Sequence, residues 1–303
     1  MSGPISQQQQ NQRANFLAQF RDQNTRRLKN FTATQFAEVW SHYDKDGNGF
    51  IEGQELDEFL REFISSVVTE DIGPEVISET ALAAMKRDFM DAFDENYDGK
   101  IEIGELSQIL PTEENFLLLF RRNNPVDSSV EFMRIWRQFD KDHSGYIEAD
   151  ELRDFLKHIL DCADRCVSED KLLEYTSTML QLFDQNRDGK LQLSEMAKLL
   201  PVKENYLCRP IFKNANRINS NDIDRVFNLY DRDKNGCIEN EELQGFLKDL
   251  LELAQEDYDA QDMLFFKKVI LDQWDVNHDG KISKDELKMI LLQQSRLASQ
   301  MGL

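Results

Sequence analysis

The chain of 303 residues lacks several features that whole classes of proteins require. No apolar run approaches the roughly 18 residues that a membrane-spanning helix needs, so we expect no membrane segment. The start, Met1 to Pro4, has neither the apolar core of a signal peptide nor the Met-Gly of a myristoylated protein. Four cysteines are too few for a disulfide framework at this length. We therefore expect a cytoplasmic protein with reduced thiols, and a redox role for Cys162 and Cys166 stays open.

A basic surface is missing as well. Lys and Arg number 36 against 57 Asp and Glu, which gives a net charge of −21. Because nucleic-acid binding depends on basic side chains that neutralise phosphates, we expect no nucleic-acid partner. The sequence also contains no nucleophile–base constellation and no glycine-rich loop for phosphates. We therefore expect no enzymatic activity.

Six twelve-residue stretches dominate what is present. Each has oxygen-bearing side chains at positions 1, 3 and 5, glycine at position 6 and glutamate at position 12. This is the pattern of an EF-hand loop, which wraps one calcium ion. Calcium takes six to eight oxygen ligands at about 2.3–2.6 Å. Positions 1, 3 and 5 supply side-chain oxygens, position 7 its backbone carbonyl and position 12 both carboxylate oxygens, while position 9 binds directly or through water.

The predicted ligands fall into two alternating sets. The odd-numbered loops have Asp at position 3, and their ligands are Asp44, Asp46, Asn48, Phe50 and Glu55; Asp140, Asp142, Ser144, Tyr146 and Glu151; and Asp231, Asp233, Asn235, Cys237 and Glu242. The even-numbered loops have Asn at position 3, and their ligands are Asp94, Asn96, Asp98, Lys100 and Glu105; Asp184, Asn186, Asp188, Lys190 and Glu195; and Asp275, Asn277, Asp279, Lys281 and Glu286. We predict six Ca²⁺ sites, with Mg²⁺ as a competitor for the same oxygen ligands.

The residues around the loops predict an all-α fold. Apolar residues recur at helical spacing before and after the loops, as in Phe36, Val39, Trp40 and Tyr43 before the first. Position 8 is always Ile or Leu, which suits a very short strand that pairs with the same position of another loop. A single helix–loop–helix unit cannot bury its apolar face alone, so we expect the hands to pair.

The alternation of odd and even loops indicates a two-hand unit repeated three times. The predicted segments are an N-terminal polar extension (1–31), pair 1 (32–110), a docking linker (111–127), pair 2 (128–200), a second docking linker (201–217), pair 3 (218–295) and a C-terminal tail (296–303). Residues 16–20 could add a helical turn. Because the linkers contain apolar residues, we expect them to form short helices that join the pairs into one compact assembly.

One segment carries a family resemblance. The run Ile-Leu-Pro-Thr-Glu-Glu-Asn-Phe-Leu-Leu from Ile109 to Leu118, together with six loops and with Glu148 to Glu151 after Tyr146 and Ile147, resembles calbindin and calretinin, with secretagogin more distant. The resemblance spans about residues 32–295. It implies cytosolic, often neuronal calcium-buffering proteins with six hands in one all-α domain. It also implies one or two degenerate loops, including the sixth, whereas the sixth loop here keeps every ligand.

Composition and packing positions favour a calcium buffer. The six loops hold 26 acidic and 9 basic residues, so they carry −17 of the net charge. Position 16 is a large apolar residue in every hand and the nine methionines are scattered, which is typical of a fixed core. The alternatives are a sensor or adaptor that binds protein targets when loaded with calcium, and a calcium-dependent scaffold. We expect a monomer, with the fourth and sixth sites weaker because each has three carboxylates.

Overall fold

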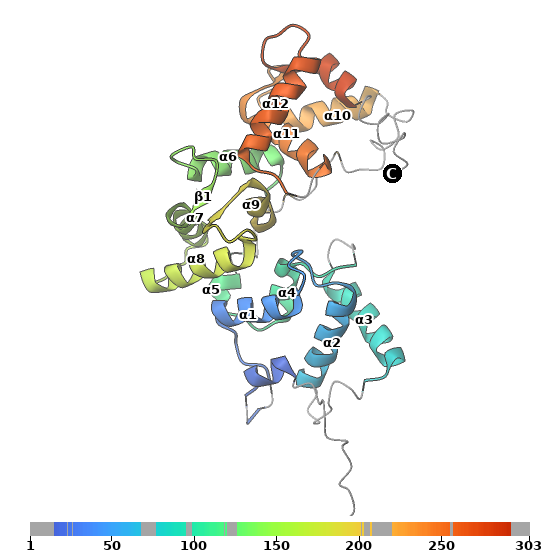
Figure 1. Cartoon of the computed structure of the whole chain (residues 1–303), viewed down its shortest axis with the longest axis vertical. Helices are drawn as coiled ribbons and strands as arrows, with labels where there is room; N and C mark the ends of the chain where they lie inside the picture. The colour runs from blue at the N-terminus through green and yellow to red at the C-terminus, as the bar shows by residue number, and fades with distance from the viewer. Residues whose placement is uncertain are drawn as a thin grey trace, which may run out of the picture. The chain divides into compact units, whose positions relative to one another are not determined.

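The computed structural model describes residues 15–22, 24–25, 27–67, 77–94, 99–117, 119, 126–200, 202, 207, 220–254 and 257–291. The chain divides into two compact units, Met1–Arg121 and Arg122–Leu303, and each is described by itself (Figure 1). Throughout the described residues, helices alternate with loops, and the strands are two residues long. The all-α prediction is confirmed.

The first unit contains the first two loops. Its elements are the 3₁₀-helix η1 (Phe16–Phe20) and the helices α1 (Ala33–Tyr43), α2 (Gly53–Val67), α3 (Glu79–Phe93), α4 (Ile103–Ile109) and α5 (Glu114–Leu117). The first loop joins α1 to α2, and the second joins α3 to α4. Thr32 begins α1 with a capping box, and Ser78 caps α3, each satisfying backbone N–H groups that a helix start leaves unpaired.

The predicted helical turn at residues 16–20 is η1, and it packs onto α2. Leu17 is fully buried. The N–H of Phe16 donates to the carboxylate of Glu62 at 2.7 Å, and the hydroxyl of Tyr43 donates to the same oxygen at 2.8 Å. The side chain of Asn15 reaches the Ser65 hydroxyl at 2.6 Å. The end of α2 is therefore covered by the segment that precedes the first hand.

The second unit contains the remaining four loops. Its elements are α6 (Ser129–Phe139), β1 (Ile147–Glu148), α7 (Ala149–Cys162), α8 (Glu169–Phe183), β2 (Lys190–Leu191), α9 (Leu193–Leu199), α10 (Ser220–Tyr230), β3 (Cys237–Ile238), α11 (Asn240–Ala254), α12 (Ala260–Trp274) and β4 (Ile282–Ser283), with residues 284–291 also helical. The third to sixth loops lie before α7, α9, α11 and residues 284–291.

Within this unit, the third and fifth hands meet through α6 and α11, which lie side by side (Figure 1). A Cβ on Gly245 would lie only 2.6 Å from the backbone nitrogen of Val130, so the two helices approach to a distance that only glycine permits. The Ser129 hydroxyl donates to the buried carboxylate of Asp249, which also accepts from the hydroxyl of Tyr230. Burial raises the pKa of Asp249 to about 6.

Position 8 of each loop pairs with position 8 of its neighbour, as predicted. β1 pairs with β2 in an antiparallel register that sets Ile147 opposite Leu191, and β3 pairs with β4 so that Ile238 faces Ile282. Ile51 and Ile101 form the equivalent antiparallel bridge in the first unit. All six side chains are fully buried. The hands are therefore joined two by two through their loops.

The linkers begin with a second kind of contact. Thr112 forms a parallel bridge with Phe31, and Val202 forms one with Val126. In each of the first two pairs, the residues just after the pair therefore lie beside the residues just before it. The predicted short helix is present in the first linker as α5. Apart from Val202 and Leu207, the second linker lies outside the described residues. The segment boundaries and the single assembly of all three pairs stay predictions.

Candidate metal centres

The backbone of the loops is bent twice. Position 6 is glycine in all six loops, with φ between 77° and 86°, a left-handed conformation that side chains with a Cβ adopt at a cost. Position 4 is also left-handed, at Gly47 and, with φ between 56° and 59°, at His143, Arg187, Lys234 and His278. These four residues are non-glycine, so their conformation stores strain of the kind found at binding sites. The sequence pattern gave no signal for it.

The aspartate at position 1 closes the turn. In every loop its Oδ2 accepts the N–H of the position-6 glycine, at 2.8–3.3 Å. The carboxylates of Asp94, Asp140, Asp231 and Asp275 are buried, with 4–6 % of the residue exposed. This bond fixes one oxygen of the carboxylate. In the fourth, fifth and sixth loops the other oxygen accepts the position-5 N–H at 3.1–3.2 Å.

The glutamate at position 12 is held from two sides. Its Oε1 accepts the position-2 N–H in the first, third, fourth, fifth and sixth loops, at 2.7–2.9 Å. Its Oε2 accepts the position-9 N–H in the second to sixth loops, at 2.8–3.5 Å. The glutamate lies in the first turn of the helix that follows the loop, and these bonds hold its carboxylate against the loop. In this position both of its oxygens can bind one cation.

Positions 3, 5 and 7 form a ladder of short-range bonds. The N–H of position 5 donates to the side chain at position 3, and the N–H of position 7 donates to the side chain at position 5, in all the loops except the second. In each of these loops, the bonds fix one side-chain oxygen at position 3 and one at position 5. Asn96 and Asp98 of the second loop lie outside the described residues.

Three clusters bring carboxylates together. Among the described residues, ligand atoms of Asp44, Asp46 and Glu55 lie within 4.8 Å of one another, and those of Asp140, Asp142 and Glu151 and of Asp231, Asp233 and Glu242 do the same. All three clusters are in odd-numbered loops. Among the same residues, the fourth and sixth loops contain no such cluster; their third ligand carboxylate is at position 5, where the odd-numbered loops have Asn or Ser.

Buried oxygens without a donor show that the first and third loops fit a cation. Oδ1 of Asp44, Oε2 of Glu55 and Oδ1 of Asp140 are buried and accept no hydrogen bond, an arrangement that is unfavourable for a carboxylate. Burial, reinforced by the neighbouring carboxylates of the loop, raises the pKa of Asp44 and Asp140. A hard divalent cation would supply the missing positive charge, and an all-oxygen donor set is what calcium prefers.

Position 7 adds a contact that the sequence reasoning did not predict. Nζ of Lys100 lies 4.4 Å from the ring centroid of Phe50, and Nζ of Lys190 lies 4.1 Å from that of Tyr146. In the third pair, Lys281 bonds instead to Glu239, and this raises the pKa of Lys281. The alternation of an aromatic residue with lysine at position 7 was visible in the sequence, and it marks a cation–π contact across each of the first two pairs.

The described residues include no helix long and apolar enough to cross a membrane. The EF-hand domain pair family matches residues 33–110, 129–200 and 220–292. Calbindin-32 of Drosophila melanogaster is 60 % identical over 94 % of this chain and 93 % of its own.

Human calretinin is 45 % identical over 87 % of this chain and 93 % of its own, and secretagogin of Xenopus laevis is 43 % identical over 86 % and 94 %. The chain is a calcium-binding EF-hand protein and belongs to the calbindin and calretinin family of proteins with six EF-hands.

Proposed function

We propose that this protein binds six calcium ions in the cytoplasm and acts as a buffer that shapes calcium transients. Magnesium competes for the same oxygen ligands, and the chain works as a monomer without catalytic activity. The single observation that carries the proposal is the repeated loop geometry. In all six loops the position-1 carboxylate is fixed by the position-6 N–H, and the position-12 carboxylate by at least one N–H of its own loop.

The buffer role is supported by the side chains at position 16. Five of them are buried, with at most 4 % exposed, and Ile109 is half-buried; the five are Phe59, Phe155, Leu199, Phe246 and Ile290. Hands that act as sensors open on binding and expose a groove rich in methionine, whereas the hands of buffers barely open. Large apolar residues fixed in the core favour the second behaviour.

A sensor role is the second candidate, and one surface favours it. Leu264 and Phe265 are adjacent on α12 and are 67 % and 70 % exposed. Two large apolar side chains in water at one place are typical of a surface that binds a protein target. The sensor role would require this surface, or one like it, to grow when calcium binds.

A calcium titration with two readouts separates the roles. Calorimetry measures the bound ions while an environment-sensitive dye measures exposed apolar surface in the same range of calcium. The buffer proposal predicts heat of binding with little change in dye fluorescence. A strong rise that the double substitution Leu264→Ser and Phe265→Ser removes would replace the buffer with a sensor, and would place its target surface on α12.

A further inference from the structure

A short segment of the third pair contacts the fourth loop, which belongs to the second pair. Both lie in the second compact unit. Residues 257–259 lead into α12. Here the hydroxyl of Ser194 donates to Oδ1 of Asp257 at 3.0 Å, and the side-chain amide of Gln192 donates to the same oxygen. The N–H of Ser194 donates to the carbonyl of Tyr258 at 3.1 Å. Ser194 and Tyr258 are buried, with 4 % and 3 % exposed.

The two side chains that Asp257 contacts occupy positions 9 and 11 of the fourth loop. Position 9 contributes to an EF-hand site directly or through water, and position 11 adjoins Glu195 at position 12. Because a carboxylate can only accept, the NH₂ group of Gln192 must face Asp257. Its carbonyl oxygen then faces the start of α9, where Gln192 forms a capping box with Glu195. The contact therefore sets the orientation of the amide at position 9, next to the glutamate at position 12.

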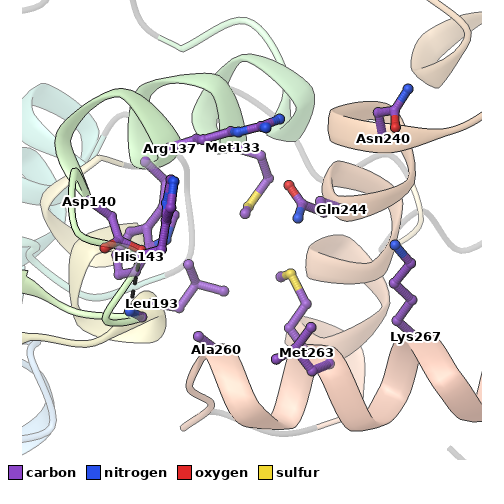
Figure 2. A pocket seen from close by; sticks show the side chains of 13 residues that line it. Met133, Arg137, Asp140, His143, Leu193, Asn240, Gln244, Ala260, Met263 and Lys267 are labelled. Carbon is purple, nitrogen blue, oxygen red and sulfur yellow. Dashed lines mark hydrogen bonds between the residues drawn. The ribbon is translucent and has the colours of Figure 1, made fainter.

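The same segment also contacts the third loop. A Cβ on Gly145, at position 6 of that loop, would lie 2.8 Å from the Cβ of Ala260, the first residue of α12. Beyond this contact is a cavity of about 410 Å³. Met133 of α6 and Met263 of α12 extend into it from opposite sides (Figure 2). Here α6 and α12 line a cavity instead of packing against each other, so the segment meets the second pair through the bonds of Asp257 and Tyr258 and through Ala260.

The sixth loop provides an internal comparison. Its position-9 residue, Ser283, donates its hydroxyl to Oε2 of Glu286 at 2.7 Å, so the partner of position 9 comes from the same loop. In the fourth loop, the amide at position 9 donates to Ser194 of its own loop at 3.2 Å and also to Asp257 of another pair. The two loops share the pattern Asp-x-Asn-x-Asp-Gly-Lys. They differ in which residues contact the side chain at position 9.

We propose that Asp257 is a positioning residue for the fourth calcium site. By accepting from Gln192 and Ser194 it holds positions 9 and 11, and with them the start of α9 that carries Glu195. Calcium binding at this site and docking of the residue 257–260 segment are thereby coupled, and coupling of two binding equilibria is reciprocal. The inference rests on the proposed function, since it requires that the fourth loop binds calcium.

The test uses the full-length protein and two substitutions. Asp257→Ala removes the acceptor and the charge, whereas Asp257→Asn removes the charge and keeps an acceptor oxygen. The amide of Gly189, at position 6, reports on the fourth site in a calcium titration followed by NMR, and the amide of Gly280 reports on the sixth. We expect Asp257→Ala to weaken the fourth site about tenfold, the effect of one to two hydrogen bonds. Asp257→Asn should stay within about twofold, and the sixth site should not change.

Two results would overturn the proposal. One is an unchanged fourth site in Asp257→Ala. The other is an equal loss in Asp257→Asn, because it would assign the effect to charge alone. A metal-free measurement tests the contact itself: the Ser194 amide should exchange its hydrogen faster in Asp257→Ala than in the wild type, and an equal rate contradicts the contact. If the NMR signal of the Gly189 amide in the wild type does not change with calcium, the proposed fourth site is wrong. The hydrogen exchange of the Ser194 amide then still tests whether Asp257 holds this contact.

Discussion

The odd-numbered and even-numbered hands use the same loop length in different ways. The odd loops place acids at positions 1, 3 and 12, and these carboxylates gather within 4.8 Å. The even loops have asparagine at position 3, carry the third acid at position 5 instead, and place lysine at position 7. In the first two pairs that lysine reaches across to an aromatic ring of the odd loop. The odd loop thus concentrates negative charge, and its even partner brings a cation next to it.

The second helices differ as well. In the odd hands α2, α7 and α11 are 14–15 residues long, whereas α4 and α9 of the even hands have seven residues. In two odd hands, the additional turns carry an acid that bonds to the aromatic residue just before the loop. The Tyr43 hydroxyl donates to Glu62, and the Tyr230 hydroxyl donates to Asp249. The additional turns are then covered by other parts of the chain, η1 on α2 and α6 on α11. The long second helices of the first and fifth hands therefore provide contacts to other parts of their units.

The largest expected effect is that of removing calcium. An ion that binds only the folded state stabilises it by about 4 kcal/mol per site when its concentration is a thousand times the Kd. The chelated protein also keeps the repulsion within the three carboxylate clusters. We expect chelation to lower the Tm by roughly 20 °C or more in calorimetry. Re-addition of calcium is the control, and an unchanged melting curve would contradict sites that are coupled to folding.

A smaller effect concerns the long helix of the fifth hand. Because burial raises the pKa of Asp249 to about 6, the folded state holds this proton between about pH 4 and pH 6 while the unfolded state has released it. Stability should therefore fall by about 3 kcal/mol as the pH rises through this window. Asp249→Asn keeps an acceptor oxygen for only one of the Ser129 and Tyr230 hydroxyls, but its side chain does not titrate, so it should remove this part of the pH dependence.

Urea unfolding from pH 4 to pH 7, with calcium constant, compares the two proteins. Asp161→Asn removes one exposed carboxylate from the end of another long helix, and it serves as the charge control. If the difference between wild type and Asp249→Asn does not vary with pH, Asp249 does not titrate in this range.

The smallest effect comes from exchanging position 3 between loop types. Asp142→Asn should stabilise the metal-free protein by up to about 1 kcal/mol, because it removes one charge from the Asp140–Glu151 cluster, and it should weaken calcium binding there. Asn186→Asp should do the reverse in the fourth loop. Both substitutions keep the acceptor for the position-5 N–H. Denaturant unfolding with and without calcium measures them, and shifts of equal sign would refute the comparison.

Sequence patterns were enough for the local structure. Apolar spacing placed the helices, and the isoleucines and leucines at position 8 indicated the bridges, since both depend on residues close to a loop. The contacts of Gly245 with Val130, and of Asp257 with Ser194, could not be predicted, because they join segments with no shared motif or periodicity. Strain at His143 and its equivalents was also missed. At position 4 the left-handed conformation is adopted by residues of several types, so the sequence does not indicate it. At position 6 the glycine indicates it.

The number of ions bound per chain tests the central claim most directly. Native mass spectrometry in excess calcium should show six ions on the wild type and five on Glu286→Gln, which disables only the sixth loop. Five or fewer ions on the wild type, or an unchanged count in Glu286→Gln, would contradict six working sites.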